Sequence, residues 1–174
     1  MSRTISIDIT DPASVSAAVS AITAYERLVV SKCEELRRRV AFLIATRARD
    51  IFNTAIADDL MAEGYVFGNV EVTVEHHGAT TLVIANGEDA IFMEFGSGIY
   101  HNGAVGSSPN PWGAALGYTI GSYGPNGAKN VWGFTGADGK LHLTHGVPAS
   151  MPLYRVVTAV AGDIVNIARR VFST

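Results

Sequence analysis

Cysteine and charge are both scarce in this sequence. Among 174 residues there is one cysteine, Cys33, so the chain has no intrachain disulfide. Its position in a strongly helical stretch favours a small, buried apolar side chain over a reactive thiol. Charged residues make up 17% and the net charge is -3, which excludes the global basic field of duplex-binding proteins. Hydrophobic residues make up 48%, enough for a folded core.

Targeting and membrane-spanning features are also missing. The first ten residues lack the apolar core and the cleavage site of a signal peptide. No apolar run approaches the roughly 20 residues needed to cross a bilayer. We therefore expect a protein that is made and folded in the cytoplasm and has no membrane partner.

Residues 11–63 contain no glycine and no proline after Pro12, and this absence predicts a long helix region over residues 11–63. Asp11-Pro12 has the order of a helix cap and first turn, and Gly64 marks the end. The stretch is either one helix or two helices with a break near Thr23–Tyr25. Its apolar residues recur in steps of three, four or seven, a heptad-like stripe that a small domain cannot cover by itself. They are Val15, Val19, Ile22, Val29, Cys33, Leu36, Val40 and Leu43.

The rest of the chain predicts an α+β fold in a single domain, residues 1–174. Alternating apolar residues before Asp11 predict an edge strand or an ordered N-terminal arm, residues 1–10. Residues 66–95 predict a small antiparallel sheet, in which the last apolar run, 90–95, is either a third strand or a short helix. Residues 141–174 predict a strand and a C-terminal helix, and the two helices pack on the sheet.

Residues 96–140 differ from the rest in being rich in glycine and in holding both tryptophans, Trp112 and Trp132. A structureless loop of this length is uncommon in a compact domain. Because exposed aromatic side chains are costly, we interpret the segment as a loop or hairpin excursion that becomes ordered against a partner.

Two phrases in the chain resemble a known family. One is Phe92–Ile99 (FMEFGSGI), and the other is Thr144–Tyr154 (THGVPASMPLY), with Gly121–Gly124 and Val131–Phe134 between them. Their order is similar to that of the neck or tail-completion proteins, the minor tail components that join head to tail in long-tailed phages. The resemblance covers the chain from the long helix to the C-terminus.

The resemblance implies a structural virion protein and not an enzyme, with no cofactor. Six or twelve copies would form a ring between the connector or head-closure protein and the tail tube or tail terminator. Genomic DNA would pass through it without sequence-specific contacts. The alternative within the same virion is a tail terminator or a head-closure protein. The arginines between 37 and 49 then either form salt bridges between subunits, which we prefer, or face the DNA.

Interface residues are expected in both phrases and in the excursion, where aromatic side chains act as anchors. Gly96 and Gly98 allow a bend after the strand, and the Glu94 carboxylate is placed to accept backbone N–H bonds. Pro152 fits the first turn of the last helix, and Ser150 fits its cap. The expected interface residues are Glu94, Phe95, Gly96, Ser97, Gly98, Trp112, Tyr118, Tyr123, Trp132, Phe134, Pro148, Met151 and Pro152.

A different class of function, a small metal-dependent enzyme, would use Glu94, His142 and His145, with His101 as a further candidate. The two histidines stand three residues apart on a strand or turn, and no Cys or Asp joins them at the usual ligand spacing. Ser97 does not match the G-x-S-x-G nucleophile pattern. We therefore expect turn and loop histidines that make hydrogen bonds.

Overall fold

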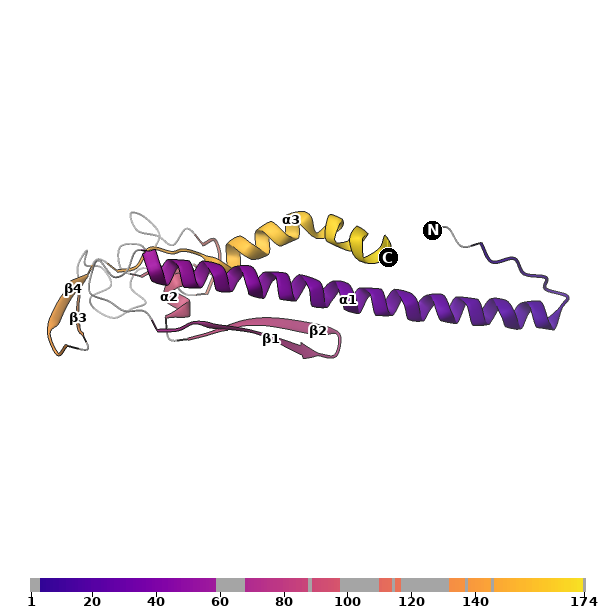
Figure 1. Ribbon diagram of the computed structural model, residues 1–174, viewed down its shortest axis with the longest axis horizontal. Coiled ribbons are helices and arrows are strands. Elements are labelled where there is room, and N and C mark those ends of the chain that lie inside the picture. Colours follow the sequence, from indigo (N-terminus) through magenta and orange to yellow (C-terminus); the bar gives the residue numbers. More distant parts are fainter. Residues whose placement is uncertain are drawn as a thin grey trace. The chain divides into compact units, whose positions relative to one another are not determined.

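The computed structural model describes eight segments of the chain. They are residues 4–58, 68–87, 89–97, 110–113, 115–116, 132–136, 138–144 and 146–173. The chain divides into two compact units, Met1–Val40 with Ile164–Thr174, and Ala41–Asp163. Helices α1 (Pro12–Asp58) and α3 (Pro152–Ser173) contribute to both units (Figure 1). The α+β class predicted from the sequence is confirmed.

Helix α1 begins where the sequence predicts. The Asp11 carboxylate accepts hydrogen bonds from the backbone N–H groups of Ala13, at 3.0 Å, and Ser14, at 3.3 Å. These bonds satisfy two of the N–H groups that lack a partner at a helix start. The helix then continues to Asp58 with no break at Thr23–Tyr25. At 1.5 Å per residue it is about 70 Å long.

The first unit excludes the strand alternative for the N-terminal arm and corrects one further expectation. Residues 4–11 form a turn and irregular chain and contain no strand, because the arm is held by local hydrogen bonds around Asp8 instead of by a neighbouring strand. Cys33 is exposed and not buried. On the same helix Glu35 pairs with Arg39 at 2.6 Å and with Lys32 at 3.2 Å, while Glu34 and Arg38 within this described segment form no ion pair.

Helix α1 also has the length and composition of a membrane-crossing helix, contrary to the sequence expectation. Within Pro12–Ala55 an 18-residue window reaches a mean hydropathy of 1.2, and only 6% of that window is buried. Among the described residues it is the single helix with these properties. Such a helix is weak evidence for a membrane, because core helices and signal sequences share them.

The second unit begins with an antiparallel hairpin of β1 (Glu71–His77) and β2 (Thr80–Asn86). Val72 pairs with Ala85 and Val74 with Val83, so these side chains share one face, and Val72 is buried. The turn falls at Gly78, whose φ of +56° suits glycine. The Arg49 guanidinium on α1 donates a 2.7 Å hydrogen bond to the Val72 carbonyl, which ties the hairpin to α1.

The last apolar run of residues 66–95 is a helix, α2 (Ala90–Phe95), and not a third strand. Three consecutive residues, Met93, Glu94 and Phe95, are all buried, and a strand on a two-stranded sheet would expose every second one. The described part of residues 66–95 therefore holds two strands and one helix. A second hairpin, β3 (Trp132–Thr135) and β4 (Leu141–Thr144), combines the predicted last strand with the end of the excursion.

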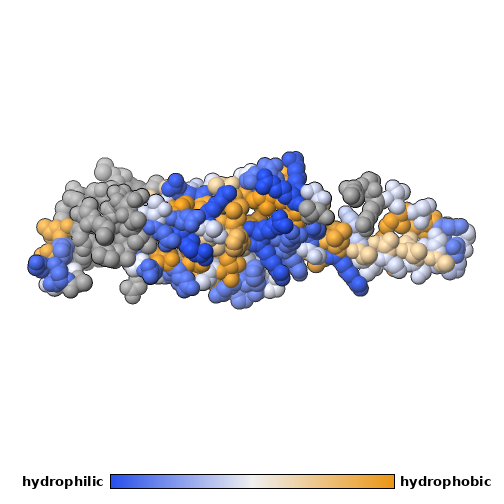
Figure 2. All heavy atoms as spheres, viewed as in Figure 1, coloured by the Kyte–Doolittle hydropathy of each residue, from blue (hydrophilic) through white to orange (hydrophobic). Residues whose placement is uncertain are grey.

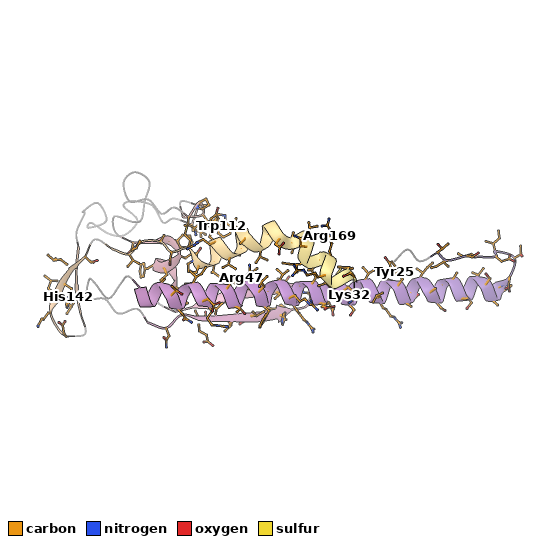
Figure 3. All side chains as sticks on the ribbon, turned by 45° about the horizontal axis from the view of Figure 1, so that its top comes forward. Tyr25, Lys32, Arg47, Trp112, His142 and Arg169 are labelled. Carbon is orange, nitrogen blue, oxygen red and sulfur yellow. The ribbon has the colours of Figure 1, made fainter. Side chains whose placement is uncertain are left out.

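The core of the second unit lies along the last third of α1. Ala41, Ala45, Ala48 and Phe52 recur in steps of three and four, and all are buried. In this unit α1 lies between the β1–β2 hairpin and the first half of α3 (Figures 1 and 3). Small alanine side chains allow close approach of the neighbouring elements, and Phe52 fills the remaining space.

Candidate functional site

The two phrases that carry the family resemblance meet in the second unit. Ser97 and Val147, 50 residues apart, exchange backbone hydrogen bonds of 2.8 and 3.2 Å, and the Ser97 hydroxyl also accepts from the Val147 N–H at 3.0 Å. The carbonyl oxygen of Met93 accepts from the backbone N–H groups of Ser150 and Met151 and from the Ser150 hydroxyl. We call this contact between residues 92–97 and 146–154 the motif joint.

Glu94 is the centre of the motif joint. Its Oε2 accepts the Leu153 N–H at 2.8 Å, and its Oε1 accepts the Tyr154 N–H at 2.9 Å and the Asn110 side-chain amide at 2.9 Å. Because α3 begins at Pro152, Glu94 caps that helix from a distance of 59 residues in the chain. A carboxylate at a helix N-terminus is favoured both by the free N–H groups and by the helix dipole.

The capping role that the sequence suggested for Ser150 is therefore wrong. Ser150 points its hydroxyl to the Met93 carbonyl, and Glu94 takes its place at the N-terminus of α3. The expectation that Glu94 accepts backbone N–H bonds is confirmed, although the donors belong to the second phrase and not to the bend after α2. Pro152 at the first turn of α3 is also confirmed, and it is fully buried.

Two residues of the motif joint hold unusual backbone angles. Gly96, which ends α2, has a φ of +78°, as the bend after α2 requires. Met151 has a φ of +51°, a left-handed conformation that few residues other than glycine adopt. The Met151 N–H bond to Met93 and the start of α3 at the next residue hold it there.

Asn110 extends the motif joint to Trp112, and neither connection was predicted. Asn110 is 2% exposed; its amide donates to Glu94, and its Oδ1 accepts the Trp112 N–H at 3.0 Å. The Trp112 ring meets the Tyr154 ring edge to face, with centroids 5.4 Å apart. The sequence signal that was available is Asn110-Pro111, a common turn start, but nothing in it points to Glu94.

Burial raises the pKa of the Glu94 carboxyl above its usual range, and the hydrogen bonds from Leu153, Tyr154 and Asn110 counteract only part of that rise. The raised pKa means that the folded chain binds this proton more tightly than the unfolded chain. The resulting stabilisation is complete below the unfolded pKa of 4.5 and is lost as the pH rises through the folded pKa.

A comparison of the wild type with Glu94→Gln isolates this pH dependence. Gln does not titrate, so the free energy of unfolding of the wild type minus that of the variant should fall as the pH rises from 4.5 toward neutral. Urea unfolding at several pH values measures the difference, from which the other carboxyl groups cancel. A difference that grew with pH would show that the hydrogen bonds outweigh burial.

A cleft of about 510 Å³ lies beside the motif joint, within the second unit. Ile51, Thr54 and Ala55 of α1 form one wall, and Met93 and residues 147–150 form another. Asp50 and Arg155 also line it; both are exposed, and the Arg155 guanidinium is 3.4 Å from the Ser150 carbonyl. The cleft therefore offers an apolar floor with one acidic and one basic group at the edge.

The other predicted interface residues fall into three groups. Phe95, Gly96 and Ser97 are buried in the chain itself, where they maintain the motif joint. Trp112 is 49% exposed, and Pro148 is exposed at the cleft. The third group lies outside the described residues and consists of Gly98, Tyr118 and Tyr123. Trp132 and Phe134 also belong to it, because only their backbones, in β3, are described.

The metal-site residues do not come together in the part of the chain that is described. Glu94 is engaged in capping α3, and His142 pairs with Asp138 at 3.0 Å in the β3–β4 hairpin. His101 and His145 lie outside the described residues. No group of three or more metal-ligating side chains occurs among the residues described. Figure 3 labels His142 in the β3–β4 hairpin.

Comparisons with protein-family models, with curated proteins and with solved structures each found no match. The resemblance carried by the two phrases therefore stays a prediction.

Proposed function

We propose that the protein is a structural subunit of a phage virion, a neck or tail-completion ring protein that joins the connector to the tail tube. The observation that carries the proposal is the apolar surface that the chain leaves uncovered. Exposed large apolar side chains occur in the arm, in α1 and α3, in the turn at residues 110–113 and in the second hairpin; examples are Val19, Ile22, Phe42, Trp112, Leu141, Leu143 and Phe172. Figure 2 shows such surface in orange and pale tones on the N-terminal half of α1.

Uncovered apolar surface of this extent is typical of a subunit that is completed by its neighbours. Two polar side chains that the sequence raised as candidates for an enzyme are engaged in folding in the described part of the chain. The Glu94 carboxylate caps α3, and the Ser97 hydroxyl accepts the Val147 N–H. Glu94 and Ser97 belong to the first phrase, so in this proposal the family phrases shape the subunit and the exposed aromatic and aliphatic side chains meet its partners.

Trp112→Ala tests the proposal. The ring is half exposed, so its loss should leave the subunit folded while the joining of heads to tails falls at least about tenfold, as expected for an interface anchor. Glu71→Ala removes an exposed polar side chain of β1 that belongs neither to the predicted interface nor to the uncovered apolar surface, and it is the control.

Joining is measured by adding purified subunit to separated heads and tails and counting complete particles by electron microscopy. Wild-type subunit should convert heads and tails to particles, and Trp112→Ala should leave them apart. Normal joining by Trp112→Ala would contradict the anchoring role, and no joining by the wild type would contradict the proposed function.

A further inference from the structure

We propose that the N-terminal half of α1, residues 13–30, packs side by side and in parallel with the same segment of a second copy, through two different faces of the helix. This inference rests on the ring-forming part of the proposed function and does not need the virion. The partner is a second copy of this chain, and the interface is heterologous, which is the type of contact from which a closed ring of identical copies is built.

One face of this segment is an apolar ridge. Val15, Val19 and Ile22 follow each other in steps of four and three, and Glu26 and Val29 continue the series. The three leading side chains are exposed by 39%, 58% and 53%. The ridge is therefore uncovered at these three side chains, although the neighbouring Ala18 is only 5% exposed.

The same stripe is covered further along. In the first unit the last turns of α3 lie beside α1 (Figures 1 and 3). Val171 of α3 is fully buried, and Val29 and Leu36 of α1 are half-buried. Helix α3 ends at Ser173. Because the covered part of the stripe packs against a helix, the uncovered part has the side-chain spacing to accept a helix as well.

The opposite face is a groove of small residues. The groove consists of Ala13, Ala17, Ser20 and Ala24. Each of these residues precedes a residue of the ridge series by two positions, which places the groove about 200° from the ridge around the helix. All four are exposed. A ridge of branched side chains on one face and a row of small ones on the other are complementary in shape between copies, but not within one copy.

Charge specifies the register between the copies. Glu26 follows Ile22 on the ridge, and Arg27 follows Ala24 in the groove, only about 1.5 Å apart along the axis. Both are exposed, and neither forms an ion pair within the described part of the chain. When the ridge of one copy enters the groove of the next in parallel, Glu26 faces the next copy's Arg27 at the same height. An antiparallel pairing would separate them.

The same two charges argue against a lipid bilayer as the partner of residues 13–30. They lie inside the apolar window of α1, where each would cost roughly 3 kcal/mol at the centre of a membrane. Between copies they neutralise each other at the edge of the contact. The ridge and groove also differ in shape, and lipid tails would not require that difference.

The first experiment measures assembly of the full-length protein by sedimentation velocity over a concentration series. Val19→Ser with Ile22→Ser should raise the concentration for half-assembly at least tenfold, while the matched control Val165→Ser, at 56% exposure on α3, should leave it unchanged. Glu26→Arg should weaken assembly, and adding Arg27→Glu in the same chain should restore it, because every contact then holds the pair reversed.

Cross-linking distinguishes the two-face contact from a symmetric one. In a Cys33→Ser background, a mixture of Val19→Cys and Ser20→Cys chains should form disulfide-linked dimers, and Val19→Cys alone should not. Linking of Val19→Cys to itself would overturn the proposal in favour of a two-fold dimer.

Three further outcomes would overturn it. One is a wild-type protein that forms oligomers whose assembly the ridge substitutions do not weaken. The ring of the proposed function would then stand, but its copies would meet through another interface. A second is a full-length chain that stays monomeric yet joins heads to tails. The third is flotation of the wild type, but not of the ridge variant, with phosphatidylcholine–phosphatidylglycerol vesicles.

Discussion

Replacing Glu94 with Ala should lower the free energy of unfolding of the second unit by roughly 3 kcal/mol, because three donors lose a charged acceptor at once. The N–H groups of Leu153 and Tyr154 would then lack a cap, and the Asn110 amide, which is buried, would lose an acceptor. Buried donors without partners cost more than the net value of the bonds that they had formed.

The loss of Glu94 should loosen the N-terminus of α3 before it unfolds the whole second unit. Amide hydrogen exchange should accelerate most at Leu153 and Tyr154 and should spread to Ser97 and Val147, whose mutual hydrogen bonds depend on the same motif joint. Glu94→Gln keeps the shape and one acceptor oxygen, so it should cost about half as much.

Glu71→Ala is the control for the loss of a carboxylate. Glu71 is exposed at the start of β1, and its replacement should change the free energy of unfolding by less than about 0.5 kcal/mol. If Glu94→Ala unfolded in urea at the same midpoint as Glu71→Ala, the cap would have no energetic role and the motif joint would be held by Met93 and Ser97 alone.

Most of the fold could be predicted because the signals for helices, strands and turns depend on residues that are close together in the sequence. Asp11-Pro12 predicts the start of α1, and the absence of glycine predicts a long helix region but leaves open a break near Thr23–Tyr25. Alternating valines fix β1. The run at Ala90–Phe95 fits both a strand and a helix, and the choice depends on tertiary burial around Glu94, which no local pattern contains.

The motif joint could be predicted only in part. The sequence placed a carboxylate acceptor at Glu94 and a helix start at Pro152, but the bond between them spans 59 residues. Asn110 carries a turn signal and no signal for its contact with Glu94. Cys33 was expected to be buried because it continues an apolar stripe, yet it is exposed between Val29 and Leu36, which are half-buried on the same stripe. Which members of a stripe are covered depends on tertiary packing, which no local pattern contains.

The same dependence on tertiary cover separates the two phenylalanines of α1. Phe52 is fully buried in the second unit, whereas Phe42, ten residues earlier on the same helix and in the same unit, is 70% exposed. Their chemistry and helix propensity are identical, so the difference between their alanine variants measures packing alone.

Phe52→Ala should therefore cost about 3–5 kcal/mol of unfolding free energy, because it leaves a cavity among Ala45, Ala48 and the elements that pack on them. Phe42→Ala should cost less than about 0.5 kcal/mol. Urea unfolding followed by circular dichroism measures both. Equal losses would mean that the exposed face of α1 is covered in the isolated chain, and the argument from uncovered apolar surface to neighbouring subunits would then lose its basis.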